Sequence, residues 1–244
     1  MVADPDSASV PSFCVVLPMF NEEDNARKCV SGIADFLRME VAGSSIIAVN
    51  DGSSDATAVV LQELQKEYPE LIVEGHSVNS GYGAAVRTGF EAAMRGEWDY
   101  ALVMDADGTQ NPEFIRGFYV PMRDGVDFIK ATRYAHGGRV EGVSFKRRLI
   151  SWVGNKLAQF ALRTSLTDYT NGFRAIRTGF LPNLTTTENG FPVLLEEVHL
   201  AAKMGATFAE VPYTLGVRRG SESGSKFVYS ISVYTTYLKY LFKR

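Results

Sequence analysis

The sequence predicts an α/β fold with a mostly parallel sheet covered by helices on both faces. Short apolar runs alternate with amphipathic helical patterns through the first half of the chain. Each run is apolar at nearly every position, which is typical of strands buried on both faces. A helix between two such strands returns the chain to its starting edge, so neighbouring strands run parallel. Ligands of such sheets bind at the carboxyl ends of the strands, where functional residues are expected.

The elements follow one another in this order. Strands are predicted over residues 13–17, 46–49, 71–73 and 100–104, with a fifth beginning at 128–129. Helices are predicted over about 24–39, from Ser53 or Ser54 to about Tyr68, over about 84–95, and from Pro112. The second half predicts a short strand over 173–176, a helix over 192–204 and extended chain over 207–217. A helix over about 146–162 is expected to face inward with five apolar side chains, namely Leu149, Trp152, Val153, Leu157 and Phe160.

Composition limits the classes of protein to consider. The chain has 244 residues, 45% of them apolar, and a net charge of −3, so no global field draws it to nucleic acid or to an anionic membrane. Its two cysteines, Cys14 and Cys29, fall in a predicted strand and helix, which indicates a reducing compartment and a cytoplasmic protein. No apolar run reaches the length of a membrane span, and residues 1–11 resemble a disordered tail rather than a signal peptide. One domain is expected over 12–225, followed by an amphipathic helix over 226–244.

The strongest chemical feature is an acidic pair after the fourth strand. Asp105 and Asp107 are separated by Ala106, and the chain leaves the strand pleat there, so both carboxylates can turn toward one crevice. Their mutual repulsion would be relieved by a hard divalent cation, Mg²⁺ or Mn²⁺, which binds oxygen ligands. Such an ion would also neutralise a departing diphosphate. A solvated acidic turn is the alternative interpretation.

Further motifs follow the first three strands. They read L-P-M-F-N-E-E over 17–23, V-N-D-G-S-S-D-A-T over 49–57 and N-S-G-Y-G-A-A over 79–85. Asp51, at a strand end, can accept hydrogen bonds from a base, and the glycines around Gly83 allow close approach to a ligand or a tight turn. Each motif alone is also compatible with an ordinary turn and helix cap. Their occurrence at successive strand ends favours one binding site.

The complete set resembles the family-two glycosyltransferases of the GT-A fold, which has a Rossmann-like sheet, and within them the dolichol-phosphate (polyprenol-phosphate) mannosyltransferases. The resemblance extends from about Phe13 to Lys226. It also includes the sequences M-D-A-D-G-T-Q-N-P-E, A-T-R-Y, F-K-R-R-L-I-S, T-D-Y-T-N-G-F-R-A and G-S-K-F. It implies an inverting transferase that moves a hexose from a nucleotide sugar to a polyprenyl or dolichyl phosphate. GDP-mannose is the favoured donor and UDP-glucose the alternative.

The resemblance also implies roles for individual residues. A nucleotide-sugar site would contain Pro18, Phe20, Glu22, Asp51, Gly83, Asp105, Ala106, Asp107, Arg133, Arg218 and Lys226. The metal ligands would be Asp105 and Asp107, the acceptor phosphate would meet Arg133, Arg147 and Lys226, and catalysis would depend on Asp107, Arg133 and Arg147. Arg147 and Arg148 lie at a predicted helix start, where free N–H groups favour anions, although a solvated basic face is the alternative.

The chain departs from the family pattern at three places. Phe20 replaces a frequent tyrosine, so one hydroxyl contact is missing. Thr109 stands where many members have a metal-binding glutamine, and Gln110 follows it, which leaves the third ligand open. A one-residue insertion before Lys226 leaves open whether Arg218 or Arg219 corresponds to the family arginine.

The chemistry of the acceptor separates this hypothesis from its rivals. A phosphate monoester is largely ionised at neutral pH because its second pKa is about 6, so it needs no strong base. A transferase acting on a sugar or protein hydroxyl would need one, and the candidates are Asp168, Glu196 and Glu197. A nucleotidyltransferase would carry a glycine-rich loop after the first strand, and a non-catalytic sugar-nucleotide-binding module would not be expected to retain both metal aspartates. The histidines, His76, His136 and His199, have no ligand spacing and predict surface or packing roles.

The final helix is expected to lie at a membrane surface. Ile231, Tyr234, Leu238 and Leu241 form an apolar stripe near basic residues, as in interfacial helices. Packing on the core or on a second subunit is the alternative, and a homo-oligomer or a membrane-anchoring subunit is compatible with the same stripe. Nucleic acid is not an expected partner.

Overall fold

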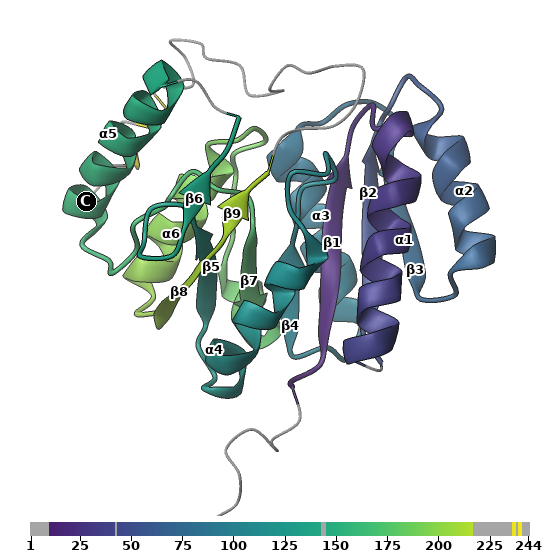
Figure 1. The fold of residues 1–244 in the computed structure, drawn as a ribbon, viewed down its shortest axis with the longest axis horizontal. Coiled ribbons are helices and arrows are strands. Elements are labelled where there is room, and N and C mark those ends of the chain that lie inside the picture. The colour runs from purple at the N-terminus through teal and green to yellow at the C-terminus, as the bar shows by residue number, and fades with distance from the viewer. Residues whose placement is uncertain (1–9, 42, 143–144, 217–235, 238, 241–244) are drawn as a thin grey trace, which may run out of the picture.

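The computed structural model describes residues 10–41, 43–142, 145–216, 236–237 and 239–240. Its centre is a seven-stranded sheet in the order β3-β2-β1-β4-β7-β5-β8 (Figure 1). The strands are β1 (Phe13–Met19), β2 (Ser45–Asp51), β3 (Leu71–His76), β4 (Tyr100–Val103), β5 (Phe128–Thr132), β7 (Arg174–Arg177) and β8 (Phe208–Pro212). All neighbouring strands are parallel except β7, which is antiparallel to both β4 and β5. The predicted mostly parallel α/β sheet is therefore confirmed.

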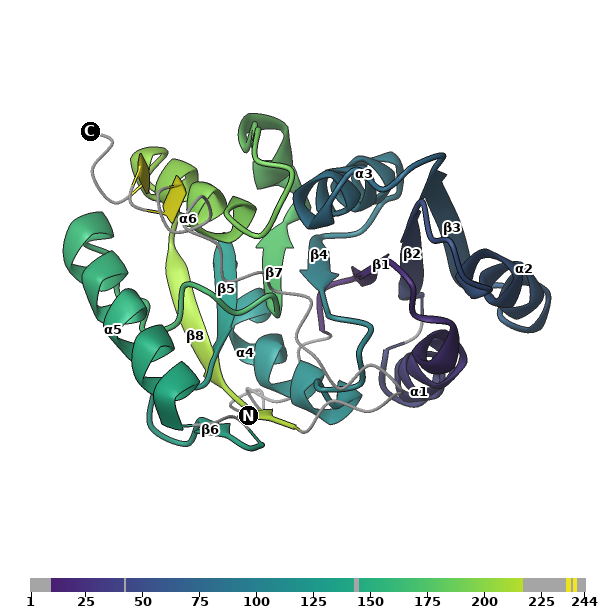
Figure 2. The same cartoon turned by 90° about the horizontal axis from the view of Figure 1, so that it is seen from above.

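Helices cover both faces of the sheet (Figure 2). One face carries α1 (Glu23–Glu40), α2 (Thr57–Glu67), the 3₁₀ helix η2 (Pro112–Phe118) and α4 (Tyr119–Arg123). The other carries α3 (Tyr82–Arg95), the 3₁₀ helix η3 (Thr178–Asn183) and α6 (Val193–Lys203). Two short strands, β6 (Arg139–Val140) and β9 (Thr214–Leu215), pair separately, and α5 (Phe145–Leu162) lies at the edge beside α6. The buried side chains form one apolar cluster on each face.

Several predicted boundaries are corrected. The helix expected from Ser53 or Ser54 begins at Thr57, because Gly52 adopts φ +62° and residues 52–56 form the preceding turn. The helix expected from Pro112 is a 3₁₀ helix followed by the short α4. Extended chain over 207–217 is divided into β8 and β9.

The apolar side chains of α5 do not face inward, so that prediction is wrong. Leu149, Trp152, Val153, Leu157 and Phe160 are between 43% and 85% exposed. The buried side is the opposite one, where Ala158 and Asn155 lie, and Asn155 Oδ1 accepts the N–H of Tyr169 at 2.7 Å. The periodicity predicted a two-faced helix but assigned the wrong face to the core.

Two predicted segments lie outside the described residues. The tail over residues 1–11 is described only from Val10 onward, and it remains a prediction. Of the helix over 226–244, only residues 236–237 and 239–240 are described, and they are helical. There Tyr240 is buried, its hydroxyl donates to Glu188 Oε1 at 2.8 Å, and its ring meets His199 edge to face. In the described part of the chain no helix is long and apolar enough to cross a bilayer.

Candidate active site

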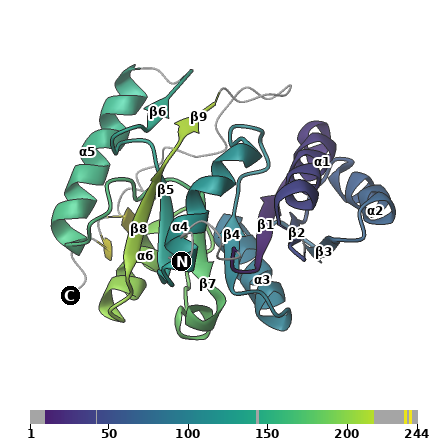
Figure 3. The ribbon, with the colours of Figure 1, turned by 60° about the horizontal axis from the view of Figure 1, so that its bottom comes forward.

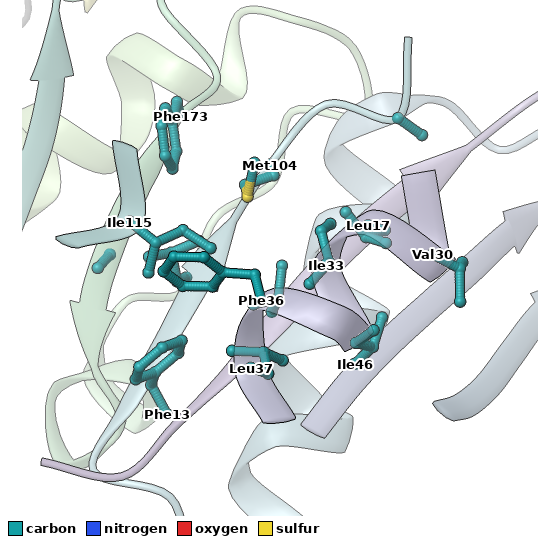
Figure 4. Close-up of a cluster of buried hydrophobic side chains, with 14 of the residues drawn as sticks. Phe13, Leu17, Val30, Ile33, Phe36, Leu37, Ile46, Met104, Ile115 and Phe173 are labelled. Atoms are coloured by element: carbon teal, nitrogen blue, oxygen red, sulfur yellow. The ribbon is translucent and has the colours of Figure 1, made fainter. Parts of the chain in front are cut away.

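The site lies at one edge of the sheet, where the carboxyl ends of β1, β2, β3, β4 and β5 meet. Because β7 runs in the opposite direction, the loop that precedes it, residues 167–173, reaches the same edge. Met104, directly before Asp105, and Phe173, directly after Gly172, lie in the same apolar cluster (Figure 4). One core therefore anchors the loops on both sides of the predicted metal aspartates.

The two metal aspartates are held by residues that follow them. Gln110 and Asp105 pair reciprocally, since the Asp105 N–H donates to Gln110 Oε1 at 2.9 Å and Gln110 Nε2 donates to Asp105 Oδ2 at 2.8 Å. Asp107 Oδ1 accepts the N–H of Thr109 at 3.1 Å and its hydroxyl at 2.6 Å. Thr109 and Gln110, the residues that leave the third metal ligand open in the sequence, thus orient the two carboxylates in this structure. Ala106 between them is buried in the core.

Negative charge converges beside α1. Burial and, in decreasing order, the charges of Asp107, Glu22 and Asp105 together raise the pKa of the Cys29 thiol to about 12. The three carboxylates therefore act on one point of the helix, although they come from different strand ends. Glu22 is buried, and its Oε2 accepts a hydrogen bond from Asn25. The thiols of Cys14 and Cys29 are both unpaired, as expected.

The oxygen ligands fit a shared divalent cation better than a metal held by protein alone. Among the residues that the structure describes, no group of three or more His, Cys, Asp or Glu side chains is placed to hold a metal ion. Mg²⁺ is commonly held by one or two carboxylates together with substrate phosphates. Asp105 and Asp107 provide such an incomplete set of hard oxygen ligands, which a diphosphate would complete.

Asp105 is positioned by a glycine and a buried ion pair. A β-carbon added to Gly172 would lie 2.7 Å from Asp105 Oδ1 and 2.9 Å from the Tyr82 hydroxyl. Behind Gly172, Arg174 donates to the Gly172 carbonyl at 2.6 Å and to the Tyr82 hydroxyl at 3.3 Å. Arg174 is fully buried and forms a bidentate ion pair with the equally buried Glu197 of α6. A polar network thus connects α6 to the loop that carries Asp105 and Asp107.

The nucleotide half of the predicted site lies at the ends of β1 and β2. Pro18 and Phe20 are partly exposed, whereas Asp51 is 3% exposed. Asp51 accepts the N–H groups of Ser80 and Gly81, each at 2.8 Å. The turn after it is tight, since a β-carbon on Gly52 would overlap the Val78 backbone.

Contacts within the chain explain why position 83 is a glycine. Its N–H donates to the Asn189 carbonyl at 2.6 Å, and a β-carbon there would lie 2.2 Å from the Glu188 carbonyl oxygen. In this structure the close contact at Gly83 is with another segment of the chain, residues 188–189. A contact between Gly83 and a nucleotide sugar stays a prediction.

Arg133 follows β5 and is fixed by Asp168. Its Nε and Nη2 donate to the two carboxylate oxygens at 2.7 and 2.8 Å, and Nη2 also donates to Thr170 Oγ1 at 3.0 Å. Burial opposes the charged guanidinium, but the charge and hydrogen bonds of Asp168 outweigh it and raise the pKa of Arg133. Earlier on β5, burial lowers the pKa of Lys130 to about 7, and Lys130 Nζ donates to the Asn171 carbonyl.

None of the three predicted bases is available to a hydroxyl acceptor. Asp168 is fully buried in the pair with Arg133, and Glu197 is fully buried in the pair with Arg174. Glu196 accepts the N–H groups of Thr187 and Glu188 and the Thr187 hydroxyl. Burial raises the pKa of Glu196, but these hydrogen bonds lower it by more. All three carboxylates have structural partners.

The structure describes only some of the remaining predicted residues. Arg148 is exposed, and His136 is exposed as predicted. His199 is buried against Tyr240, which confirms a packing role. His76 is different, because Nδ1 lies 2.6 Å from Asp51 Oδ1 in the predicted nucleotide site. The Arg147 side chain and the residues Arg218, Arg219 and Lys226 lie outside what the structure describes.

Several known proteins are similar to this chain over most of its length. Curated relatives include a dolichol-phosphate mannosyltransferase of Pyrococcus furiosus, 32% identical over 87% of this chain, which spans 58% of that protein. A polyprenol monophosphomannose synthase of Mycolicibacterium smegmatis is 28% identical over 86% of this chain and 81% of its own length. An undecaprenyl-phosphate mannosyltransferase of Micrococcus luteus is 28% identical over 85% of each chain.

Solved structures show the same fold. Glucosyl-3-phosphoglycerate synthase of Mycobacterium tuberculosis, crystallised with Mn²⁺, UDP-glucose and phosphoglyceric acid, matches with a TM-score of 0.67 at 20% identity, covering 95% of this chain and 80% of its own. Its complex with Mg²⁺ and UDP gives 0.66 at 21% identity, covering 95% and 79%. This likeness confirms the GT-A type of sheet. The family model described as Glycosyl transferase family 2 matches residues 14–184, and the chain therefore belongs to that family of glycosyltransferases.

Proposed function

We propose that this glycosyltransferase moves a hexosyl group from a nucleotide sugar to the phosphate of a polyprenyl or dolichyl lipid, with inversion at the anomeric carbon. Three relatives named for polyprenyl or dolichyl phosphate mannosyl transfer support the acceptor class. One observation in the structure carries the choice of a phosphate over a hydroxyl. Asp168, Glu196 and Glu197, the bases that a hydroxyl acceptor would need, are all held by other protein groups.

The proposed reaction is a single displacement. A phosphate oxygen of the lipid attacks the anomeric carbon, the carbon–oxygen bond to the diphosphate breaks, and nucleoside diphosphate leaves with the bonding electrons. The acceptor is already ionised, so no proton has to be removed from it. Asp105 and Asp107 would hold Mg²⁺ or Mn²⁺, which when bound neutralises charge that develops on the diphosphate.

Arg133 is the described cation best placed to meet a phosphate. Asp168 uses one edge of its guanidinium through Nε and Nη2, and among the described residues Nη1 has no acceptor. Its side chain is 14% exposed, so the remaining edge is close to solvent while its charge is fixed in orientation. Arginine binds phosphate through paired N–H donors. Arg147 and Lys226 stay predicted acceptor contacts.

A screen of donors and acceptors tests this function. Purified protein with Mn²⁺ or Mg²⁺ is expected to transfer a hexose to a short polyprenyl phosphate, with GDP-mannose and UDP-glucose as the first donors. Polyprenol without the phosphate is the matched control and should accept no sugar. Transfer to polyprenol or to a free sugar hydroxyl, without transfer to the phosphate, would contradict the proposal.

The lipid acceptor requires contact with a membrane, and α5 offers a surface for it. Six large apolar side chains are between 40% and 85% exposed, namely Leu149, Ile150, Trp152, Val153, Leu157 and Phe160. At about 100° per residue they cover less than half of the helix circumference. Figures 1 and 3 show α5 at the outer edge of the molecule, away from α1 and α2.

Charge favours an anionic lipid surface as the partner of this face. Residues 142–167 contain five basic side chains and no acidic one, in a chain whose net charge is −3. An apolar stripe beside basic residues is typical of helices that lie in the membrane interface. The basic start of α5 is also the predicted acceptor-phosphate segment. We therefore propose α5, rather than the helix over 226–244, as the principal membrane contact of a peripheral protein.

Charge placed on this face should release the protein from membranes. Replacing Trp152 and Phe160 together with glutamate is expected to lower binding to phosphatidylglycerol vesicles at least about tenfold, because burial of each side chain contributes about 1.5–3 kcal/mol. Vesicle flotation measures the bound fraction. The matched control replaces Met39 and Val59, which are 77% and 57% exposed on α1 and α2, with glutamate.

The result discriminates between possible partners of α5. Binding should also fall with added salt and on neutral phosphatidylcholine vesicles, since exposed charges are screened. Equal flotation of the two double variants would contradict docking through α5. A wild-type dimer in solution that only the α5 variant disrupts, without flotation, would instead make this face a subunit interface.

A further inference from the structure

His76 and Asp51 form a contact that the reaction scheme does not yet use. Asp51 ends β2 and His76 ends β3, and the two residues are register partners in the parallel sheet. The imidazole Nδ1 lies 2.6 Å from Asp51 Oδ1, and Nε2 lies 2.9 Å from Thr88 Oγ1 on α3. The side chains are 18% and 5% exposed, so both partners are largely removed from water.

The contact fixes the proton on one ring nitrogen. An ionised carboxylate only accepts hydrogen bonds, so His76 Nδ1 carries the proton that it donates to Asp51. The Thr88 hydroxyl holds Nε2 and with it the plane of the ring. The imidazole is thereby fixed from two sides, by β2 and by α3. Its Nδ1–H is an oriented donor to a single oxygen of Asp51.

Counting hydrogen bonds shows how much accepting capacity Asp51 retains. A carboxylate has about four lone-pair positions, two on each oxygen. Oδ1 accepts from His76 and from the Ser80 N–H, while Oδ2 accepts from the Gly81 N–H. One position remains, and it is on Oδ2. Asp51 therefore has room for one additional donor.

We propose that His76 is a positioning residue that sets base selectivity by occupying Oδ1 of Asp51, so that the site favours uridine over guanosine nucleotides. The inference depends on the proposed function and on the predicted contact between Asp51 and the base of the donor. Uracil offers one N–H between two carbonyls, which the remaining Oδ2 position satisfies. Guanine offers two adjacent N–H donors that suit a carboxylate with both oxygens available, and one of them would lack its partner here.

The proposed base selectivity discriminates between GDP-mannose and UDP-glucose, the two donors considered from the sequence. The resemblance favoured GDP-mannose, whereas the acceptor count at Asp51 favours a UDP-linked hexose, such as UDP-glucose. A buried donor without a partner weakens binding by about tenfold or more. The difference should appear in the bare nucleoside diphosphates, since UDP and GDP share the ribose and both phosphates.

Calorimetric titration of UDP and GDP with Mn²⁺ tests the proposal on the intact chain. The wild type is expected to bind UDP at least about tenfold more tightly than GDP. His76→Leu, which removes the donor to Oδ1, should bring the ratio of dissociation constants close to one. His76→Asn keeps an N–H near the position of Nδ1 and should restore the ratio. Thr88→Val removes only the outer contact and should retain it.

Steady-state kinetics distinguish a residue that positions the base from one that only supports the fold. Loss of His76 should raise KM for the UDP-hexose and leave kcat within about twofold, because the base takes no part in bond breaking. Tighter or equal binding of GDP to the wild type would overturn the inference, and that comparison needs no variant that could fail to fold. An unchanged ratio in folded His76→Leu would remove His76 from base selection. Binding of neither nucleotide would contradict the proposed function itself.

Discussion

Replacing Asp107 with alanine is expected to lower kcat/KM for transfer about a thousandfold while the protein stays folded. A bound cation stabilises charge in the transition state by several kcal/mol, and about 4 kcal/mol corresponds to three powers of ten. Asp107 is only partly buried, and its Oδ1 accepts the N–H and the hydroxyl of Thr109 in the turn that follows. Its removal therefore loosens one turn, which costs about 1 kcal/mol of stability.

The control variant separates metal binding from a general effect of lost charge. Asp124→Ala removes an exposed aspartate that follows α4 and should transfer at the wild-type rate. Rates are measured with saturating Mn²⁺, and the wild type stripped with EDTA should fall to the level of Asp107→Ala. Full activity after EDTA treatment would refute the metal assignment, as would equal rates for the two variants.

The sequence predicted the strands of the sheet well because each strand is marked by a local apolar run. Apolar runs such as those of β1, β2 and β4 mark strands buried on both faces, and the helices between them enforce parallel neighbours. The direction of β7 was not predictable in the same way. A strand of four residues carries no sign of direction. β7 is antiparallel because the segment between β5 and β7, which includes α5, returns the chain to the edge of the sheet at which β5 ends.

The error at α5 has a related cause. Periodicity reveals that Leu149, Trp152 and Phe160 share one side of a helix, but it does not reveal what covers that side. The usual assumption is a core, and here the core takes the opposite side through Ala158. The absence of acidic residues over 142–167 was the available signal in favour of the anionic lipid surface that we propose for this side.

The site was predictable where its residues are adjacent and was missed where they are distant. Asp105 and Asp107 are neighbours in a motif. His76 is 25 residues from Asp51, and only the paired ends of β2 and β3 bring them together. Gly172 belongs to a quoted motif, but its closeness to Asp105, 67 positions earlier, appears only in the fold. Matching strand ends across the predicted sheet would have found His76, whereas nothing local predicted the pairing of Arg174 with Glu197.

That ion pair carries the largest expected effect on stability. Replacing Glu197 with alanine should lower the free energy of unfolding by about 3–5 kcal/mol, because it leaves the Arg174 guanidinium buried without a counter-charge. Both side chains are 0% exposed, so water cannot substitute for the lost carboxylate. With about 3 °C per kcal/mol for a chain of this size, Tm should fall by about 10 °C. Thermal and urea unfolding followed by circular dichroism measure both quantities.

Two comparisons show whether burial is the cause. Glu67→Ala breaks a surface pair with Arg27, whose side chains are 49% and 48% exposed, and should cost less than about 1 kcal/mol. Arg174→Met combined with Glu197→Leu removes both buried charges, and such replacements are often neutral in stability. The double variant should therefore be more stable than Glu197→Ala, although Gly172 and Tyr82 lose their donor. If Glu197→Ala is no less stable than Glu67→Ala, the guanidinium must find another partner and the network behind Asp105 is not held by this pair.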